Sequence, residues 1–568
     1  MEHKDPDGAP GASSDERREG TTDGARSRAS EPDRGDNDDG RDRDVDARRA
    51  PLAMHPETFR RVGHELVDDI AEFLGSLRSR PVTHGESPTA VREALGADAP
   101  LPEHGEEPGE LLRSTAGLLF DHSLFNAHPR FFGYITAPAA PIGMLGDLLA
   151  SAANPNVGAW TLSPMATEIE AQTVRWIAEL IGYPTDCGGL LVSGGNMANM
   201  VAFWAARRAV GGEGVRQRGV GGDGGGGAVG GTGGGSRGDG RGHRDDGGLG
   251  ALRVYGSAET HTWIEKATDL AGLGTAAMRW IPTDDELRMD VDALGDAIRA
   301  DLDAGDRPMM VVGTGGSVST GAVDRLHEIA GLCRELDVWF HVDGAYGGFA
   351  AAVPDAAPEL EALRLADSVA VDPHKWLYSP LEAGCALVRD PQALRDAFSY
   401  HPPYYHFGVE ATNFVDFGPQ NSRGFRALKV WLALRQVGRE GYRRMIGDDI
   451  RLSERLYERV AEHPELEPVT RSLSITTFRY IPRDLWADRG TDRVGSYLNT
   501  LNEELLDRIQ LSGRAFVSNA VIRGRYVLRA CIVNFNTTEA DVDALPPIAA
   551  GIGREVDQEL RERELPSH

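Results

Sequence analysis

Five short apolar segments, each ending in small residues, alternate with amphipathic stretches between residues 116 and 400. They read GGLLVSGG, ALRVYGS, RPMMVVGTGG, VWFHVDGAY and SVAVDP. Apolar strands that alternate with helices predict an α/β fold, in which a mostly parallel central sheet is flanked by helices on both faces. Ligands of such sheets bind at the carboxyl ends of the strands. The residues that follow these five segments are therefore the first candidates for a functional site.

The flanking regions have different patterns. Residues 1–50 are rich in Asp, Arg, Gly and Ser and are predicted to be a disordered tail. Residues 51–115 are predicted to be an N-terminal helical segment, since Phe59, Val62, Leu66, Ile70 and Leu74 recur at helical spacing.

A large domain is predicted over residues 116–400. It is interrupted at 211–250, where roughly half of the residues are glycine and a flexible insertion is expected. Residues 401–568 are predicted to form a small α+β C-terminal domain. Its expected helices are FRALKVWLALRQVG and IRLSERLYERVAEH, and its expected strands are LSITTFRYI and YVLRACIVN.

Charge and composition exclude several classes of function. A net charge of -27 disfavours binding to nucleic acid or anionic lipid. The sequence has neither a long apolar run nor an apolar leader, so we expect no membrane span and a cytoplasmic location. The four cysteines, Cys187, Cys333, Cys385 and Cys531, are too far apart for a zinc motif or a disulfide framework, and no metal site is predicted.

The segment ADSVAVDPHKWLYSP contains the strongest chemical signal. A predicted strand ends at Val371, and Lys375 follows it closely, between His374 and Trp376. Only four lysines occur in the chain, at positions 4, 266, 375 and 429. A lysine that forms an imine needs a buried, electropositive setting, which this context suits. The alternative is a surface lysine in a loop.

Asp343 stands where the segment VWFHVDGAY meets a turn of small residues. A carboxylate there can pair with a protonated pyridine nitrogen and make the ring an electron sink. By itself Asp343 is equally consistent with a helix or turn cap. Asp343 lies about thirty residues before Lys375, at the end of the preceding strand, and this position makes the pyridine role more specific. Together the two residues predict pyridoxal 5'-phosphate (PLP) as the cofactor.

Two further segments suit the same cofactor. In LLVSGGNMANMVAFWAARR a strand leads through Gly194, Gly195 and Asn196 into a helix, whose first N–H groups bind phosphate well. In VYGSAETHTWIEKA, His261 follows a strand and opens a helix, where its ring can stack on a cofactor. The ordinary alternatives are a glycine turn for the first and a cap or surface histidine for the second.

With these residues in place, the chain resembles the group II PLP-dependent decarboxylases, which include the aromatic amino acid, glutamate, histidine and 2,4-diaminobutyrate decarboxylases. HPRFFGYITAP, SPMATEIE, HVDGAY and DPHKW occur in the order and at the spacing of that family. The resemblance runs from about Pro51 to the C-terminus, apart from the glycine-rich insertion. It implies the fold type I architecture of aspartate aminotransferase and a homodimer with shared active sites.

The resemblance also implies a role for each site residue. Lys375 would hold PLP as a Schiff base, Asp343 would face the pyridine nitrogen with Ala345 beneath the ring, and His261 would stack above it. In FSYHPPYYHFG, Tyr404, whose neighbour is Tyr405, matches a mobile-loop tyrosine that protonates the decarboxylated carbon. The residues expected near the phosphate are Gly194, Gly195, Asn196, Ser317 and His374.

Some positions depart from the family pattern. Asn196-Met197-Ala198 stands where Ser-Glu-Ala is common, although asparagine still donates a hydrogen bond. Asp372 replaces an asparagine of some members, and because a carboxylate would repel phosphate we expect it to point away or to cap a turn. Ile135, Thr136 and Gly158 replace a Phe-Pro pair and a bulky aromatic residue, which argues against a DOPA-like substrate.

The activity implied by the resemblance is decarboxylation of a free L-amino acid to its amine and CO2. One alternative is another reaction on the same scaffold, either decarboxylation-dependent aldehyde synthesis or transamination. Tyr404 favours the amine, because its loss favours the aldehyde in this family. A different class of alternative is a non-catalytic protein that binds partners, against which Lys375, Asp343 and His261 together argue. The substrate is expected to be aromatic or otherwise bulky.

Overall fold

A computed structural model describes residues 50–220, 250–354, 356–400 and 411–564 of the chain. It divides into two compact units, with the boundary between Arg61 and Val62. The described part of the first unit is residues 50–61, which include the start of helix α1. The described residues from Val62 onward belong to the second unit. The predicted tail, residues 1–50, lies outside the described residues except for its last position.

The predicted N-terminal helices are present, and each begins with a proline, which suits the first helical position because its missing N–H has no helical partner there. Ser87 caps one of them, since its side chain accepts a hydrogen bond from Ala90 N. These helices and the two that follow are α1 (Pro56–Ser76), α2 (Pro88–Leu95), α3 (Pro108–Asp121), α4 (Pro141–Ala153) and α5 (Pro164–Leu180). Helix α3 runs across the boundary predicted between residues 115 and 116, and the division of the chain at that point remains a prediction.

The central sheet of the described chain has seven strands in the order β1-β7-β6-β5-β4-β2-β3. Strand β7 is antiparallel to both of its neighbours, and all other pairs are parallel. The predicted mostly parallel sheet is therefore confirmed, with β3 and β7 as strands that the sequence analysis did not name. The strands are β1 (Gly188–Val192), β2 (Leu252–Ser257), β3 (Met278–Ile281), β4 (Arg307–Thr314), β5 (Trp339–Asp343), β6 (Ser368–Val371) and β7 (Gly384–Val388).

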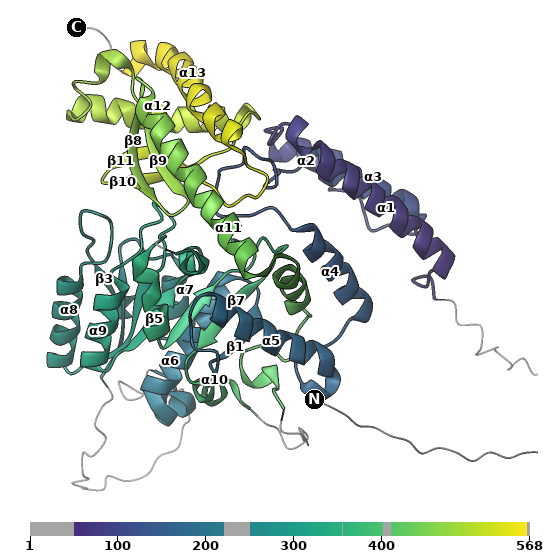
Figure 1. Cartoon of the computed structure of the whole chain (residues 1–568), viewed down its shortest axis with the longest axis vertical. Coiled ribbons are helices and arrows are strands. Elements are labelled where there is room, and N and C mark those ends of the chain that lie inside the picture. Colours follow the sequence, from purple (N-terminus) through teal and green to yellow (C-terminus); the bar gives the residue numbers. More distant parts are fainter. Residues whose placement is uncertain (1–49, 221–249, 355, 401–410, 565–568) are drawn as a thin grey trace, which may run out of the picture. The chain divides into compact units, whose positions relative to one another are not determined.

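Helices cover both faces of this sheet (Figure 1). Successive strand residues point to opposite faces. In β4, Val311 belongs to one buried apolar cluster while Met310 and Val312 belong to another. Helices α8 and α9 lie side by side against one part of the sheet. The helices of this region are α6 (Gly195–Arg218), α7 (Trp263–Leu270), α8 (Val291–Asp303), α9 (Leu326–Leu336) and α10 (Pro391–Phe398).

Helix α6 extends further than predicted. It continues to Arg218, into the segment assigned to the flexible insertion at 211–250. The backbone leaves helical geometry only at Gly212, at φ +67°, a conformation that glycine adopts without steric cost. The insertion boundary at residue 211 is therefore corrected to a point after Arg218, and residues 221–249 lie outside the described part.

The C-terminal region has the predicted α+β character. A four-stranded antiparallel sheet in the order β10-β11-β9-β8 packs against α12 and α13. The two helices predicted at 425–438 and 450–463 form one helix, α11, with a kink at Gly438, and α11 contacts both α5 and this second sheet (Figure 1). The elements are α11 (Ala427–Glu462), β8 (Leu466–Ser472), β9 (Ile475–Tyr480), α12 (Asp492–Leu511), β10 (Ser518–Ile522), β11 (Arg525–Cys531) and α13 (Glu539–Glu564). A separate domain at 401–568 remains a prediction, because contacts group it with the rest of the second unit.

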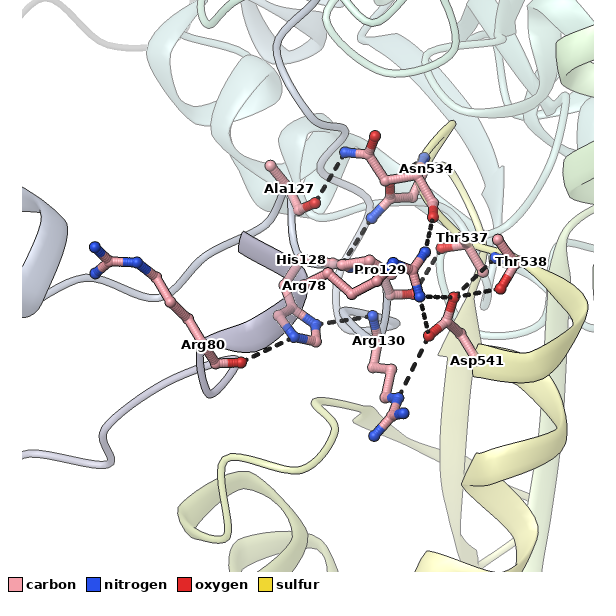
Figure 2. Close-up of polar contacts among 11 residues, drawn as sticks. Arg78, Arg80, Ala127, His128, Pro129, Arg130, Asn534, Thr537, Thr538 and Asp541 are labelled. Carbon is pink, nitrogen blue, oxygen red and sulfur yellow. Dashed lines mark hydrogen bonds and ion pairs between the residues drawn. The ribbon is translucent and has the colours of Figure 1, made fainter. Parts of the chain in front are cut away.

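The start of the motif HPRFFGYITAP is held by the segment that links β11 to α13 (Figure 2). Asn534 Nδ2 donates to His128 O at 2.9 Å, and Thr537 Oγ1 donates to Pro129 O at 2.8 Å. Asp541 pairs with Arg78 at 3.0 Å and also bonds Thr538. Burial would raise the pKa of Asp541, but these hydrogen bonds outweigh it and hold that pKa below its usual value. Residues far apart in sequence thereby fix this loop through its backbone carbonyls.

No helix in the described ranges is long and apolar enough to cross a membrane. The four cysteines are free thiols, of which Cys333, Cys385 and Cys531 are buried.

Candidate active site

A cavity lies at the carboxyl ends of the central strands, where the sequence placed its candidates. Six predicted site residues line it: Gly195, Asn196, His261, Asp343, Ala345 and Lys375. The other lining residues are Asn199, Glu259, Thr314, Gly316, Val318, Tyr346 and Asp372. The structure therefore brings together side chains from the ends of β1, β2, β4, β5 and β6.

Lys375 projects into the cavity from a tight turn after β6. The turn is closed by Lys375 N, which donates to Asp372 O at 2.9 Å, and by Tyr378 N, which donates to Lys375 O at 3.0 Å. Trp376 is fully buried directly after the lysine, with its ring centroid 4.9 Å from that of Tyr346. A packed aromatic residue next to the lysine fixes the backbone from which the amine extends.

Asp372 does not point away from the site, contrary to the sequence expectation. Its side chain lines the cavity, and Oδ2 lies 3.0 Å from Lys375 Nζ and 3.7 Å from His374 Nε2. The neighbouring cation explains the difference, because an ammonium group stabilises a buried carboxylate. The other oxygen, Oδ1, is buried without a hydrogen-bond partner among the described residues.

Asp343 ends β5 and is held through both carboxylate oxygens. Oδ1 accepts from Ala345 N at 3.1 Å, and Oδ2 accepts from Trp263 Nε1 at 2.8 Å. The side chain is buried, since Asp343 is 8% exposed. Two N–H donors orient this carboxylate within the cavity wall.

His261 precedes α7, and its exposed side chain lines the same cavity. Trp263 N donates to His261 Nδ1 at 3.2 Å, so Nδ1 acts as an acceptor and the neutral ring carries its proton on Nε2.

The start of α6 closes another side of the cavity. Gly194 has φ +113°, and a Cβ on Gly195 would lie 2.7 Å from Asp372 Oδ2 and 2.9 Å from Ala345 Cβ. Only glycine fits at position 195, and it leaves the first N–H groups of the helix open to an anion. His374 borders Gly194, and burial lowers the pKa of His374, whose Nδ1 donates to Ala383 O at 2.6 Å.

Ser317 does not line the cavity. Its hydroxyl lies 3.0 Å from Thr320 Oγ1, and its N–H donates to Ala322 O. Its assignment as a phosphate neighbour remains a prediction. Tyr404 falls at a position outside the described residues, so its role also remains a prediction from the sequence.

Sequence reasoning missed Thr314 and Trp263. Thr314 ends β4, is 6% exposed and lines the cavity, and its hydroxyl makes no hydrogen bond of ordinary geometry within the described chain. In sequence, a threonine at a strand end looks like any β-branched strand residue, and a tryptophan in a helix looks like any core residue.

These residues fit PLP. Thr314 Oγ1 and Asp372 Oδ1 are buried polar atoms without partners among the described residues, and the cradle at Gly195 is one that a Cβ would fill. The donor set matches the parts of the cofactor: an amine for its aldehyde, a carboxylate for its ring nitrogen and a helix start for its phosphate.

Comparison with known protein families gives one clear match. The model described as "Pyridoxal-dependent decarboxylase conserved domain" matches residues 88–219 and 239–481, which is more than half of the chain.

Curated relatives fall within the same family. The aromatic-L-amino-acid decarboxylase of Bacillus atrophaeus is 33% identical over 496 residues, which cover 86% of this chain and 94% of that protein. The histidine decarboxylase of Drosophila melanogaster is 31% identical over 86% of this chain and 54% of that protein. The phenylacetaldehyde synthase of a Rosa hybrid cultivar is 29% identical over 86% of this chain and 92% of its own length.

Solved structures agree. Oryza sativa TDC, crystallised with PLP and tryptamine, has a TM-score of 0.78 at 28% identity and covers 89% of this chain and 99% of its own. Catharanthus roseus tryptophan decarboxylase in complex with L-tryptophan has a TM-score of 0.75 at 25% identity, with the same coverage. The fold type I architecture is thus confirmed, and the chain belongs to the pyridoxal-dependent decarboxylase family.

Proposed function

We propose that this protein removes the α-carboxylate of an aromatic L-amino acid as CO2 and releases the corresponding amine, with Lys375 as the residue that bonds the cofactor. As a member of its family, the protein is a PLP-dependent carboxy-lyase that acts on an amino acid. The observation that carries the residue assignment is the convergence of Lys375, Asp343, His261 and the start of α6 on one cavity.

Bound PLP supplies a ring that accepts the electrons of the breaking bond between Cα and the carboxylate. The protein's own groups prepare that step. Lys375 provides the amine, and Asp372 Oδ2 pairs with it at 3.0 Å and orients it. Asp343 would face the ring nitrogen, where a carboxylate favours the protonated, electron-poor ring.

Two further groups complete the arrangement. His261 lines the cavity, and its Nδ1 accepts from Trp263 N. The first N–H groups of α6, next to Gly195, would hold the phosphate, and Thr314 lines the cavity at the end of β4. Tyr404, as a sequence prediction, returns the proton to Cα.

The preference for an aromatic side chain is supported by the relatives, several of which are named for aromatic, tyrosine or tryptophan substrates. Position 158, where the family resemblance leads us to expect a bulky aromatic residue, is a glycine, and a Cβ there would lie 2.3 Å from Asn421 O. This departure from the family pattern supports an aromatic substrate other than DOPA.

Aldehyde synthesis is the second candidate reaction, because relatives also include enzymes named phenylacetaldehyde synthase and 4-hydroxyphenylacetaldehyde synthase. The presence of Tyr404 favours the amine. Product analysis distinguishes the two, since the amine route yields amine and CO2 in equal amounts and the aldehyde route yields aldehyde instead of amine.

We further propose a homodimer in the cytoplasm. Helix α4 supports the dimer, because Leu145, Leu148 and Leu149 are each more than half exposed, at 54%, 56% and 57%. Such an apolar stripe is typical of a surface that another chain covers. Analytical ultracentrifugation of the wild type and of Leu148→Arg tests this: the proposal expects a dimer that dissociates in the variant.

The test of function is a screen of the twenty amino acids, DOPA and 2,4-diaminobutyrate for CO2 release. We expect release from an aromatic amino acid, loss of that activity in Lys375→Ala and full activity in Lys266→Ala, whose lysine is exposed on α7. No CO2 from any amino acid with PLP-loaded protein would contradict the proposal.

A further inference from the structure

We infer that Trp263 is a positioning residue for the cofactor: its indole N–H fixes the orientation of the Asp343 carboxylate toward the ring nitrogen. The inference deepens the proposed function and rests on the placement of PLP in the cavity of Lys375. Nothing in the sequence pattern singles out Trp263, because a tryptophan at the start of a helix, here the first residue of α7, is usually a core residue.

The geometry assigns one N–H donor to each oxygen of Asp343. Trp263 Nε1 donates to Oδ2 at 2.8 Å, and Ala345 N donates to Oδ1 at 3.1 Å. The backbone donor belongs to the same turn as Asp343, so it constrains the carboxylate only locally. The indole donor comes from α7, 80 residues away along the chain, and fixes the rotation of the carboxylate relative to a separate element.

Burial makes this hydrogen bond strong and specific. Trp263 is 1% exposed and Asp343 is 8% exposed, so water has little access to replace a lost donor. Hydrogen bonds to buried charged groups contribute more than those between neutral groups. The indole itself is held by edge-to-face contacts with Phe203, at 6.4 Å between ring centroids, and with His341, at 5.8 Å.

The ring of His341 is fixed in turn. It is fully buried between Ser368 Oγ and Asn199 Oδ1, each 2.8 Å from one ring nitrogen. Burial lowers the pKa of His341 to about 4, so the ring is neutral near pH 7. The Trp263 indole therefore packs against a neutral, fixed ring on one side, while its N–H donates to the charged Asp343. This packing determines the direction in which the indole N–H points.

Trp263 also connects Asp343 to His261. Its backbone N–H donates to His261 Nδ1 at 3.2 Å while its side chain reaches Asp343. The first residues of α7 therefore place two groups on the same cavity, one at the ring nitrogen and one above the ring. Any residue other than proline at position 263 supplies the backbone N–H that His261 Nδ1 accepts. Only a side chain with a donor at this reach can also bond Asp343.

A double-mutant cycle tests the inference through cofactor binding rather than turnover. The variants are Trp263→Phe, Asp343→Asn and the double variant, and the measured quantity is the dissociation constant of PLP from each apoenzyme. If Trp263 acts through Asp343, Trp263→Phe weakens binding about tenfold in the wild-type background and by less than about twofold in the Asp343→Asn background.

Trp431→Phe is the matched control. Its indole N–H also donates to a side chain, Gln172 Oε1 at 2.7 Å, and neither residue lines the cavity. We expect it to change PLP affinity by less than about twofold. If Phe at 263 prevents folding, benzothienylalanine at that position replaces the N–H by sulfur at nearly the same size and gives the same comparison.

A second readout is the pH at which the bound cofactor's visible spectrum changes as its ring nitrogen loses a proton. We expect Trp263→Phe to move that midpoint to lower pH and Trp431→Phe to leave it unchanged. Equal loss of affinity from Trp263→Phe in both backgrounds, or no loss in either, would overturn the inference. Failure of the proposed function looks different, because wild-type protein would then not bind PLP or would release no CO2.

Discussion

The carboxylate of Asp372 lies 3.0 Å from the amine of Lys375, three residues further along the same turn. This pairing joins the residue that we propose bonds the cofactor to a negative charge that we expected to point away from the site. Since Asp372 is only 2% exposed, solvent screens the contact weakly.

Asp372→Asn is predicted to slow the reaction of apoenzyme with PLP about threefold at constant pH. The variant removes the carboxylate that pairs with Lys375 Nζ at 3.0 Å, so the amine is held less firmly in the cavity. Stopped-flow absorbance after mixing apoenzyme with PLP measures the rate.

Asp147→Asn is the control for this change, since Asp147 pairs with Lys429 at 3.2 Å away from the cavity. It should leave the rate unchanged. An unchanged rate in Asp372→Asn as well would show that the pairing does not govern the reactivity of Lys375.

Thr314→Val is predicted to weaken PLP binding about five- to tenfold, because it removes the hydroxyl of a cavity-lining residue that makes no hydrogen bond of ordinary geometry within the described ranges. Equilibrium titration of apoenzyme measures the change. Thr167→Val removes another buried hydroxyl that has no such partner among the described residues, on α5 and outside the cavity, and should have no effect on affinity. Equal affinities of the Thr314 variant and the wild type would exclude a ligand contact by this hydroxyl.

Asp449→Asn is predicted to change how stability depends on pH. Asp449 on α11 accepts from Tyr378 Oη at 2.8 Å, and burial raises its pKa from 3.8 to about 7. The folded protein therefore keeps this proton between about pH 4 and pH 7 while the unfolded chain loses it, so the group's contribution to stability is lost as the pH rises through that window.

Asparagine carries no such charge, so the difference in free energy of unfolding between variant and wild type should grow in favour of the variant from pH 4 to pH 7, by on the order of 2 kcal/mol, and then level off. Urea unfolding at several pH values measures it. Asp448→Asn, an exposed neighbour on the same helix, should give a difference that does not change with pH. The same flat result for Asp449→Asn would mean that Asp449 is ionised throughout.

The sequence was most informative where the local pattern determines structure. Five strands of the central sheet were predicted because each is a short apolar run with small residues at its end. Strand β3 was missed because its four residues, Met278–Ile281, carry a charge and are buried only at the two ends, and β7 because Gly384–Val388 does not end in small residues. The single helix α11 was split at Gly438, since a glycine in a helical pattern reads as an end.

Within the site, the residues with distinctive chemistry were predicted and those with ordinary chemistry were not. Lys375 and Asp343 are rare types at strand ends. Trp263 and Thr314 are residue types that are common in helices and strands. Only the fold shows that Trp263 bonds Asp343 and that Thr314 lines the cavity. Asp372 was expected to point away from the cavity because only repulsion between its carboxylate and a phosphate was considered. Its attraction to Lys375, three residues away, was not considered.

The central claim is that Lys375 is the residue that bonds PLP. The most direct test is to add PLP to the purified protein, reduce with borohydride and identify the modified lysine by peptide mass spectrometry. With only four lysines in the chain, at positions 4, 266, 375 and 429, the result is unambiguous. The account predicts the label on the peptide that contains Lys375 and none in Lys375→Ala. A label on Lys266 or Lys429 instead, or no label at all, would contradict it.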